Sequence, residues 1–452
     1  MLKINKIDKY SELNYLILWL SSLFLLSLFL LTWMPSYFGL TPSSDIVLAG
    51  VSDGWCDSKT QGIGLHCFGD YYYPLNFTES SNPWDIEAAP PYSAASFIIF
   101  SAFNELSIVF NNASLGLYMF LLSSPLLMIL ILTQSYRKFK YPFLYVVVMF
   151  AFVIASWPFL FAFDRGNSIL LALPLTILLL RNFINKNYTM FFVALVLMSF
   201  IKIQFILFLL ILLTTREIFK FLTYGLSIIV LNIVPFIFFE QNIAYNLNAY
   251  FRTFVNFQDY AYAPAGTLNF NLSLPNSIAI LDRFVFNNPA SDISYPPTLI
   301  SVLGLILVCL FLWIRGNKLD PMHSFLIIIL FIILAPNVSF AYYLILFLGY
   351  LTYAVLDYIE SISKGQNEQI EFKFLNQLTK QNRIFILASY ILLFIPWSIP
   401  WIAVIPNFAS LNLGEFNASI TRFPGQLVLV LLFFSLLFTR STKILNKTSL
   451  RR

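Results

Sequence analysis

Long runs of apolar residues, separated by short polar and often basic segments, fill most of the chain. A helix needs about 20 apolar residues to cross the hydrocarbon core of a bilayer. The runs are continuous rather than alternating, which argues against the strands of a membrane β-barrel. In lipid, helices are the other way to satisfy backbone hydrogen bonds. The pattern predicts an all-α polytopic membrane bundle of about twelve transmembrane helices, near residues 15–34, 114–133, 143–162, 167–181, 188–200, 203–214, 217–238, 296–314, 323–335, 338–357, 384–404 and 425–439.

Composition excludes a soluble protein. Of 452 residues, 59% are hydrophobic and 11% are charged, whereas soluble domains carry about 25% charged residues. There is no glycine-rich phosphate loop, so a nucleotide-sugar site in a soluble domain is not expected. The net charge of +5 comes from basic clusters at helix ends rather than from a nucleic-acid-binding face, and we expect no nucleic-acid partner.

The basic clusters predict the topology, because positive loops stay in the cytoplasm. Placing every cluster inside puts both termini in the cytoplasm and three longer segments outside, residues 35–113, 239–295 and 405–424. The stretch 93–110 must then lie on the outer surface rather than cross, together with other juxtamembrane helices. We expect residues 1–452 to form one integral membrane domain.

Two predicted helices are interrupted. One break falls at Lys202, the only charge in the apolar stretch 188–213, and the other falls at 336–339. A broken helix survives in a membrane only where it lines a protein-buried or watery cavity. Two breaks on the same side predict one cavity that opens outward. Lys202 either binds a lipid-linked phosphate there or extends its amine to the interface.

Asp70 is a candidate general base in the first outer segment. It precedes the aromatic run 71–73, and partial desolvation beside aromatic rings would raise its pKa and suit it to base chemistry. The alternative is a solvated loop acid, because the segment holds many acids. Asp45 and Asp85 are rival candidates.

Further candidates lie in two turns and one cysteine pair. The turn 164–167 could bind a phosphate or simply form a hairpin with its own ion pair. The segment 336–343 could bind a hydroxylated ligand or form an ordinary proline turn. Cys56 and Cys67 could form a disulfide or remain free thiols. The two histidines, His66 and His323, do not have metal-ligand spacing.

The order of these motifs resembles a known family. The chain is similar to the polyprenol-phosphate-mannose-dependent α-mannosyltransferases and their relatives, glycosyltransferase family 87 of the GT-C superfamily. The matching motifs are Gly69-Asp70-Tyr71, Asn82-Pro83-Trp84, Pro90-Pro91-Tyr92, Arg165-Gly166-Asn167, Lys202 and Pro336 through Tyr343.

The resemblance implies a GT-C-type fold and a reaction. Members move a sugar from a polyprenyl-phosphate donor to an acceptor hydroxyl on the outer face of the membrane, with inversion. It implies Asp70 as the catalytic base and a set of substrate-binding residues: Lys202, Arg165, Asn167, Tyr71, Tyr92, Ser339, Tyr342 and Tyr343. It implies no metal and no other cofactor. Many relatives carry histidine where Tyr342 and Tyr343 stand here.

The expected function is transfer of a mannose-like hexose to a lipid or cell-envelope glycan. A polymerase or ligase of the O-antigen type, acting on polyprenyl-diphosphate glycans, would concentrate its function in a late outer loop, whereas here the first loop is the larger. A lipid or glycan transporter would often show repeat symmetry, and the sequence shows no internal repeat.

Overall fold

The computed structural model describes residues 68–78, 83–85, 91–112, 114–139, 143–239, 241–262, 272–275, 277–278, 297–336, 339, 341–363, 379–394 and 417–438. The predicted helix at 15–34, the cysteine pair Cys56 and Cys67, His66 and the rival acid Asp45 lie outside these residues.

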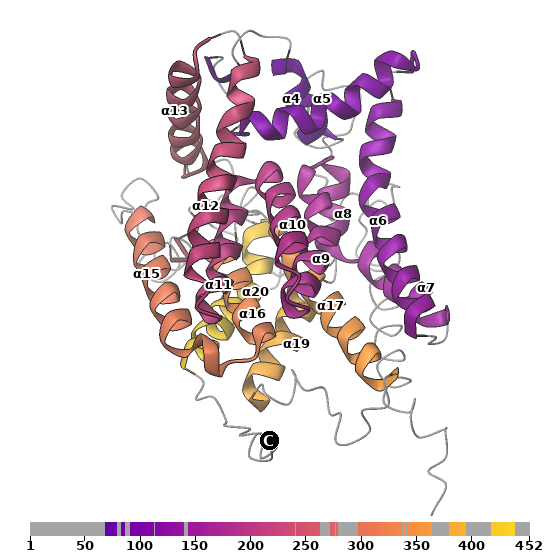
Figure 1. Cartoon of the computed structure of the whole chain (residues 1–452), viewed down its shortest axis with the longest axis vertical. Helices are drawn as coiled ribbons and strands as arrows, with labels where there is room; N and C mark the ends of the chain where they lie inside the picture. The colour runs from indigo at the N-terminus through magenta and orange to yellow at the C-terminus, as the bar shows by residue number, and fades with distance from the viewer. Residues whose placement is uncertain are drawn as a thin grey trace, which may run out of the picture.

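The described residues are helical almost throughout, with no β-strand among them (Figure 1). The first part of the chain forms α4 (Gly69–Thr78), η2 (Pro83–Asp85), α5 (Ala94–Val109), α6 (Leu115–Phe139), α7 (Phe143–Ile154), α8 (Trp157–Asp164), η3 (Ser168–Leu171), α9 (Ala172–Ile184), α10 (Tyr188–Ile201), η4 (Ile203–Leu210) and α11 (Ile211–Thr214), where η marks a 3₁₀-helix.

The later helices follow the predicted order. They are α12 (Ile218–Ile233), η5 (Val234–Phe238), α13 (Ile243–Tyr262), α15 (Pro297–Arg315), η8 (Gly316–Lys318), α16 (Pro321–Leu334), η9 (Ala341–Tyr343), α17 (Leu344–Ser363), α19 (Lys380–Phe394) and α20 (Asn417–Phe438). The interruptions predicted at Lys202 and at 336–339 are confirmed, since one helix ends and another begins at each.

The single helix predicted over 143–162 is wrong. α7 and α8 meet at a bend of 63°. Ser156 has extended backbone angles there and is the N-cap of α8, with a proline in the first turn of the new helix. Proline fits the first turn of a helix but breaks its interior, so Pro158 starts α8 rather than continuing α7.

The centre of the bundle is α16. Every residue from Met322 to Leu334 is buried, against α9, η4, α17 and α20 among others. A helix that is apolar on all sides is stable only when other apolar surfaces surround it. The surrounding helices supply those surfaces with their inner faces.

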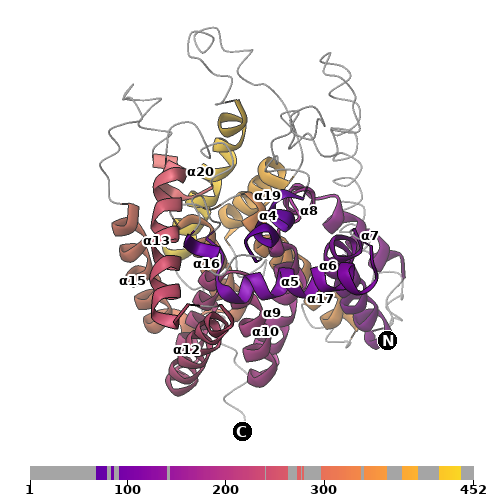
Figure 2. The ribbon, with the colours of Figure 1, turned by 90° about the horizontal axis from the view of Figure 1, so that it is seen from above.

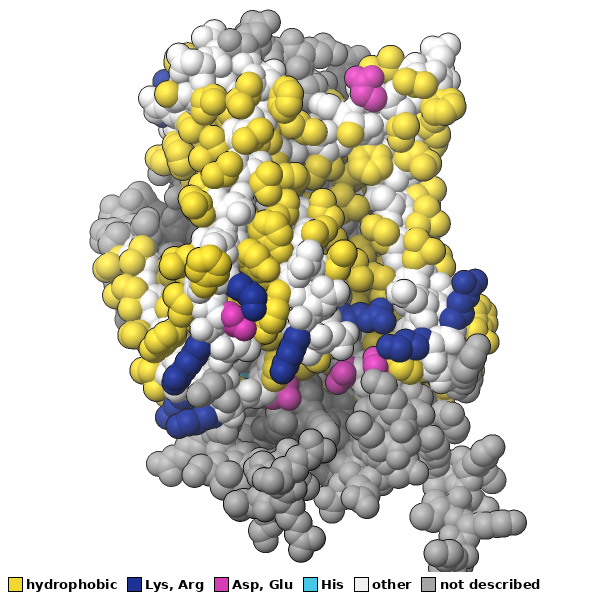
Figure 3. Space-filling model, viewed as in Figure 1, with side chains coloured by type: hydrophobic (Ala, Val, Ile, Leu, Met, Phe, Trp, Pro, Cys, Tyr) yellow, Lys and Arg dark blue, Asp and Glu magenta, His cyan; other side chains and the backbone are white. Residues whose placement is uncertain are grey.

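The outer helices turn apolar side chains outward. On α6, Tyr118, Leu122, Leu126 and Leu130 recur at every fourth residue and are 47–62% exposed. Figure 3 shows a broad hydrophobic band over this face, with Lys and Arg gathered mainly at its lower end. Water disfavours an apolar stripe of this size, whereas lipid accommodates it.

Among the described residues, two helices are long and apolar enough to cross a membrane, Leu115–Phe139 and Ile218–Phe238. A third qualifies if the bent pair α7 and α8 forms one span. The other apolar helices of the described part are shorter. The count of about twelve spans therefore stays a prediction.

α5 lies across one end of the bundle, against the end of α10 (Figures 1 and 2). Its placement outside the membrane, expected for the stretch 93–110, stays a prediction. The Ser96 hydroxyl of α5 donates to the carbonyl oxygens of Phe200 and Ile201, at 2.7 and 3.2 Å. These are among the last carbonyls of α10, which have no partner within their own helix. α5 thus caps α10 at the break.

We expect Ser96→Ala to destabilise the fold by about 1–3 kcal/mol, because two buried carbonyls lose their donor. Thermal unfolding of the detergent-purified protein measures the change. Ser123→Ala is the matched control, since the Ser123 hydroxyl bonds only to Phe120 in its own helix. Equal melting temperatures for the two variants would show that the cap contributes nothing.

Candidate active site

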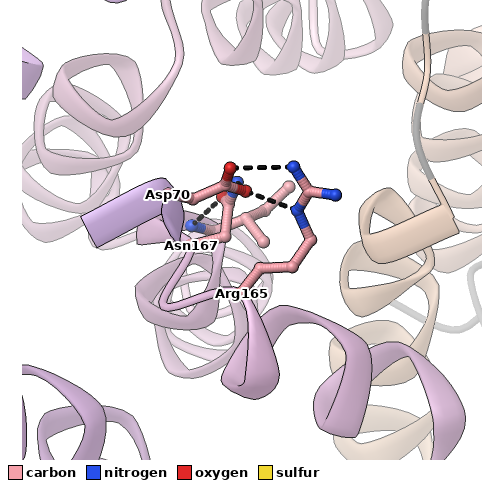
Figure 4. Close-up of polar contacts among 4 residues, drawn as sticks. Asp70, Arg165 and Asn167 are labelled. Carbon is pink, nitrogen blue, oxygen red and sulfur yellow. Dashed lines mark hydrogen bonds and ion pairs between the residues drawn. The ribbon is translucent and has the colours of Figure 1, made fainter. Parts of the chain in front are cut away.

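The candidate site is built around the carboxylate of Asp70, in the first turn of α4 (Figure 4). Arg165 donates to it twice, from Nε to Oδ2 at 2.8 Å and from Nη2 to Oδ1 at 2.9 Å. Asn167 donates a third bond from Nδ2 to Oδ2 at 2.7 Å. The Asp70 and Arg165 side chains are only 13% and 11% exposed. A two-bonded guanidinium–carboxylate pair fixes both direction and distance.

The turn between α8 and η3 places the two donors. Gly166 has a φ of +61°, which glycine adopts without steric cost. Asn167 then acts as the N-cap of η3, with its Oδ1 accepting from the amide of Ile169 at 3.0 Å. Its Nδ2 is thereby directed to Asp70. The backbone amide of Asp70 also donates to the carbonyl of Arg165 at 2.9 Å. Asp70 of α4 therefore bonds to this turn through both its side chain and its backbone.

The expected direction of the Asp70 pKa was wrong. Burial does raise the pKa of this carboxyl, but the charge and hydrogen bonds of Arg165 and the hydrogen bond of Asn167 outweigh burial. The pKa of Asp70 therefore lies below its ordinary value, and the side chain is a carboxylate at neutral pH. Asp70 is also not the solvated loop acid of the alternative interpretation, because it is buried in a helix.

Lys202 lies on the same side of the bundle as this pair. Its amine sits 4.1 Å from the ring centre of Tyr92, within the range of a cation–π contact. It is close enough to Asp70 and Arg165 for electrostatic interaction with both. The carboxylate of the early segment and the cation at the helix break therefore share one polar region.

Tyr342, in η9 after the second break, completes the region. Its ring stacks on Phe161 of α8 with centroids 5.7 Å apart, and it interacts electrostatically with Asp70 and Arg165. We call the set Asp70, Tyr92, Arg165, Asn167, Lys202 and Tyr342 the polar cluster. Tyr343 lies beside it, with its ring centroid 5.4 Å from that of Tyr342.

Two candidates do not join the polar cluster by any contact described. The Tyr71 ring is buried among aromatic side chains, with centroids 5.9 Å from Phe100 and 5.2 Å from Phe120. Ser339 is buried, and its carbonyl oxygen accepts from the amide of Leu272 at 2.6 Å. The contact of Tyr71 is ring packing, and that of Ser339 is a backbone hydrogen bond.

Asp70, which lies outside the turn 164–167, is an observed partner of Arg165. Arg165 pairs with Asp70, 95 residues away in the chain, and not only within its own turn as one interpretation of 164–167 assumed. The side chains of Asp164 and Asp85 lie outside the described part of the structure.

The sequence did not predict that Trp84 holds the backbone of Tyr92 in place. The Trp84 indole donates to the Tyr92 carbonyl at 2.9 Å, and Thr253 of α13 donates to the Trp84 carbonyl at 3.1 Å. The Trp84 ring also stacks on Phe236, with centroids 4.8 Å apart. Trp84 was noted only as part of a motif, and its link to α13 has no local signal in the chain.

No group of three or more potential metal-binding side chains occurs among the residues that the structure describes. The polar cluster instead pairs one carboxylate with two cations. It can hold an anion at Arg165 and Lys202 and accept a proton at Asp70.

An all-helical bundle with outward apolar stripes and a buried acid–cation cluster defines a helical membrane protein. The sequence matches the family model of Glycosyltransferase family 87 over residues 89–336, more than half of the 452-residue chain. The chain therefore belongs to Glycosyltransferase family 87 and is a membrane glycosyltransferase. No curated protein and no solved structure gives a significant match to it.

We expect Gly166→Ala to destabilise the turn that holds Asp70. An added Cβ would lie 2.9 Å from the Tyr71 Cβ, and a left-handed backbone costs an alanine about 1–2 kcal/mol. Thermal unfolding should show a lower melting temperature. Gly225→Ala is the control, because the nearest atom to its Cβ, on Leu209, is 3.5 Å away. A Gly166→Ala protein as stable as wild type would contradict this account of the turn.

Proposed function

We propose that this enzyme moves a mannose-like hexose from a polyprenyl-phosphate donor to an acceptor hydroxyl of a lipid or cell-envelope glycan. The observation that carries the proposal is the polar cluster, in which one buried carboxylate faces two cations. A glycosyl phosphate needs both kinds of group, a base for the incoming hydroxyl and positive charge for the departing phosphate.

The proposed step is a single displacement. Asp70 takes the proton of the acceptor hydroxyl, whose oxygen attacks the anomeric carbon of the sugar. The bond from that carbon to the phosphate oxygen breaks, the polyprenyl phosphate leaves with the bonding electrons, and the anomeric configuration inverts. Arg165 and Lys202 stabilise the charge that develops on the phosphate.

In the described structure Asp70 is held by Arg165 and Asn167, which weakens it as a base. The donor phosphate competes with Asp70 for the Arg165 guanidinium, because both are anions that accept paired hydrogen bonds from it. Once Arg165 turns to the phosphate, burial becomes the stronger influence and raises the pKa of Asp70. Donor binding would thus turn a paired carboxylate into a base.

The remaining substrate residues surround this step. Tyr92, Tyr342 and Tyr343 supply aromatic faces and hydroxyls for the sugar, and Asn167 orients Asp70. The ring packing of Tyr71 and the backbone hydrogen bond of Ser339 suit a supporting position behind the sugar.

We place the polar cluster on the extracytoplasmic side of a cell membrane, with both termini in the cytoplasm and about twelve spans in a GT-C-type bundle. The outer segments 35–113 and 239–295 would then lie around the site. Two observations support this orientation. α4 and α5 lie at the upper end of Figure 1, and the basic side chains gather at the lower end of Figure 3.

Asp70→Asn should lower the transfer rate by about 10²–10⁴-fold, the usual contribution of a positioned base. Radiolabelled polyprenyl-phosphate mannose, with membrane lipid as acceptor, provides the assay, and polyprenyl-diphosphate sugars serve as the comparison donor. Glu105→Gln, at an exposed acid of α5, should keep wild-type activity. Wild-type rates for a folded Asp70→Asn protein would remove Asp70 from the mechanism, and transfer only from the diphosphate donor would replace the proposed donor.

The exchange of Arg165 between Asp70 and the phosphate predicts a pH effect. The acid limb of kcat/KM reports the free enzyme, in which Arg165 holds the Asp70 pKa low, whereas that of kcat reports the donor complex. We expect the acid limb of kcat at higher pH than that of kcat/KM. Because the donor is a phosphodiester, its own titration does not enter this range. Coincident limbs would show that Arg165 stays on Asp70 throughout.

A further inference from the structure

The segment after the Lys202 break has an unusual form. Lys202 is extended, with φ −150° and ψ 121°, and the chain then continues as the eight-residue 3₁₀-helix η4. Runs of 3₁₀-helix longer than three or four residues are uncommon and often mark a functional segment. Gln204 lies in the first turn of η4, two residues beyond the cation of the polar cluster.

Gln204 carries a buried side-chain amide. Its side-chain nitrogen is enclosed, and no described residue accepts a hydrogen bond from it. A primary amide has two N–H donors, and leaving a buried donor unpaired costs free energy. Groups of this kind in native proteins call for an explanation, and position within a substrate site is one.

The surroundings of Gln204 connect it to the site. Its amide lies near enough to the Tyr343 hydroxyl for a hydrogen-bond interaction, although no hydrogen bond of normal length joins the two. Tyr92 in turn lies within electrostatic range of both Tyr343 and Asp70. Tyr343 therefore lies close to two members of the polar cluster, Tyr92 and Tyr342. Gln204 follows the break at Lys202, and Tyr343 belongs to η9 after the second break. The two helix breaks that contribute to the polar cluster therefore also bring this uncharged pair close to it.

The chemistry of the pair differs from that of the cluster. Arg165 and Lys202 already supply the positive charge that a phosphate requires. An amide and a phenol are neutral, and each can donate and accept. Sugar hydroxyls have the same dual character, so they match this pair better than a phosphate does.

We propose that Gln204 and Tyr343 form a subsite that binds hydroxyl groups of the transferred sugar and selects which hexose is transferred. This inference rests on the proposed function and deepens it. The amide nitrogen of Gln204 donates to one sugar hydroxyl, and the Tyr343 hydroxyl bonds to the same or the neighbouring one.

The test uses polyprenyl-phosphate donors carrying mannose or glucose, and then forms of the preferred hexose that lack one hydroxyl at a time. Sites built to bond a hydroxyl reject analogues without it strongly, so wild type should lose at least about 100-fold in kcat/KM for one such form. Gln204→Leu should be less active on the complete hexose. Its kcat/KM for the complete hexose should exceed that for the form lacking the hydroxyl by less than about threefold.

Gln134→Leu is the matched control, since Gln134 is exposed and bonds to Arg181 at 3.4 Å on another part of the bundle. It should keep the wild-type preference. If Gln204→Leu does not fold, Tyr343→Phe serves instead, because it removes only a hydroxyl and keeps the ring. Tyr343→Phe should likewise reduce the preference for the complete hexose over the form that lacks the hydroxyl.

The possible outcomes distinguish an error in the sugar subsite from an error in the proposed donor. Normal transfer by wild type with an unchanged preference in Gln204→Leu and Tyr343→Phe would overturn the subsite alone. Failure of wild type to transfer from every polyprenyl-phosphate hexose, with transfer from a diphosphate donor, would overturn the proposed donor and the subsite with it.

Discussion

The structure depends on one buried ion pair. Asp70 and Arg165 are joined by two hydrogen bonds, and Asn167 adds a third. Removing one partner of such a pair from a buried setting leaves an uncompensated charge and typically costs about 3–5 kcal/mol. The pair is also one of the contacts that join α4 to the helical bundle, beside the hydrogen bonds from Ser96 of α5 to the end of α10. The same ion pair therefore stabilises the fold and holds the Asp70 carboxylate in the polar cluster.

Interrupted helices supply the rest of the polar cluster. A continuous helix in a membrane satisfies its own backbone and offers little to a substrate, whereas a break leaves donors, acceptors and a change of direction. Here the breaks at Lys202 and before η9 bring Lys202, Tyr342 and Tyr343 to the same end as α4. The α5 helix covers this end and caps one of the breaks through Ser96.

Much of the fold could be predicted because its signals are local. Apolar runs and basic clusters predicted most helices, and the need to keep the basic clusters on one side correctly predicted a break at Lys202. The bend at Ser156 was missed, although Pro158 signals a helix start, because the apolar run continues across it. The site was harder to predict. The contact of Asp70 with Arg165 joins residues 95 positions apart, so no spacing rule reveals it, and the pKa direction was wrong as a result. Gln204 could have been noticed only as a polar residue in an apolar run.

The burial of α16 on every side has a consequence for the order in which the molecule matures. During synthesis this segment emerges after more than three hundred residues have left the ribosome, yet it fills the middle of the bundle. The earlier helices α9, η4, α11 and α15 can therefore complete their contacts in the core only after α16 has been made. The contact of α4 with the 165–167 turn needs no such wait, because both partners are already made. The Asp70–Arg165 pair can thus form before α16 is made, whereas Tyr342 of η9 joins the polar cluster only after α16.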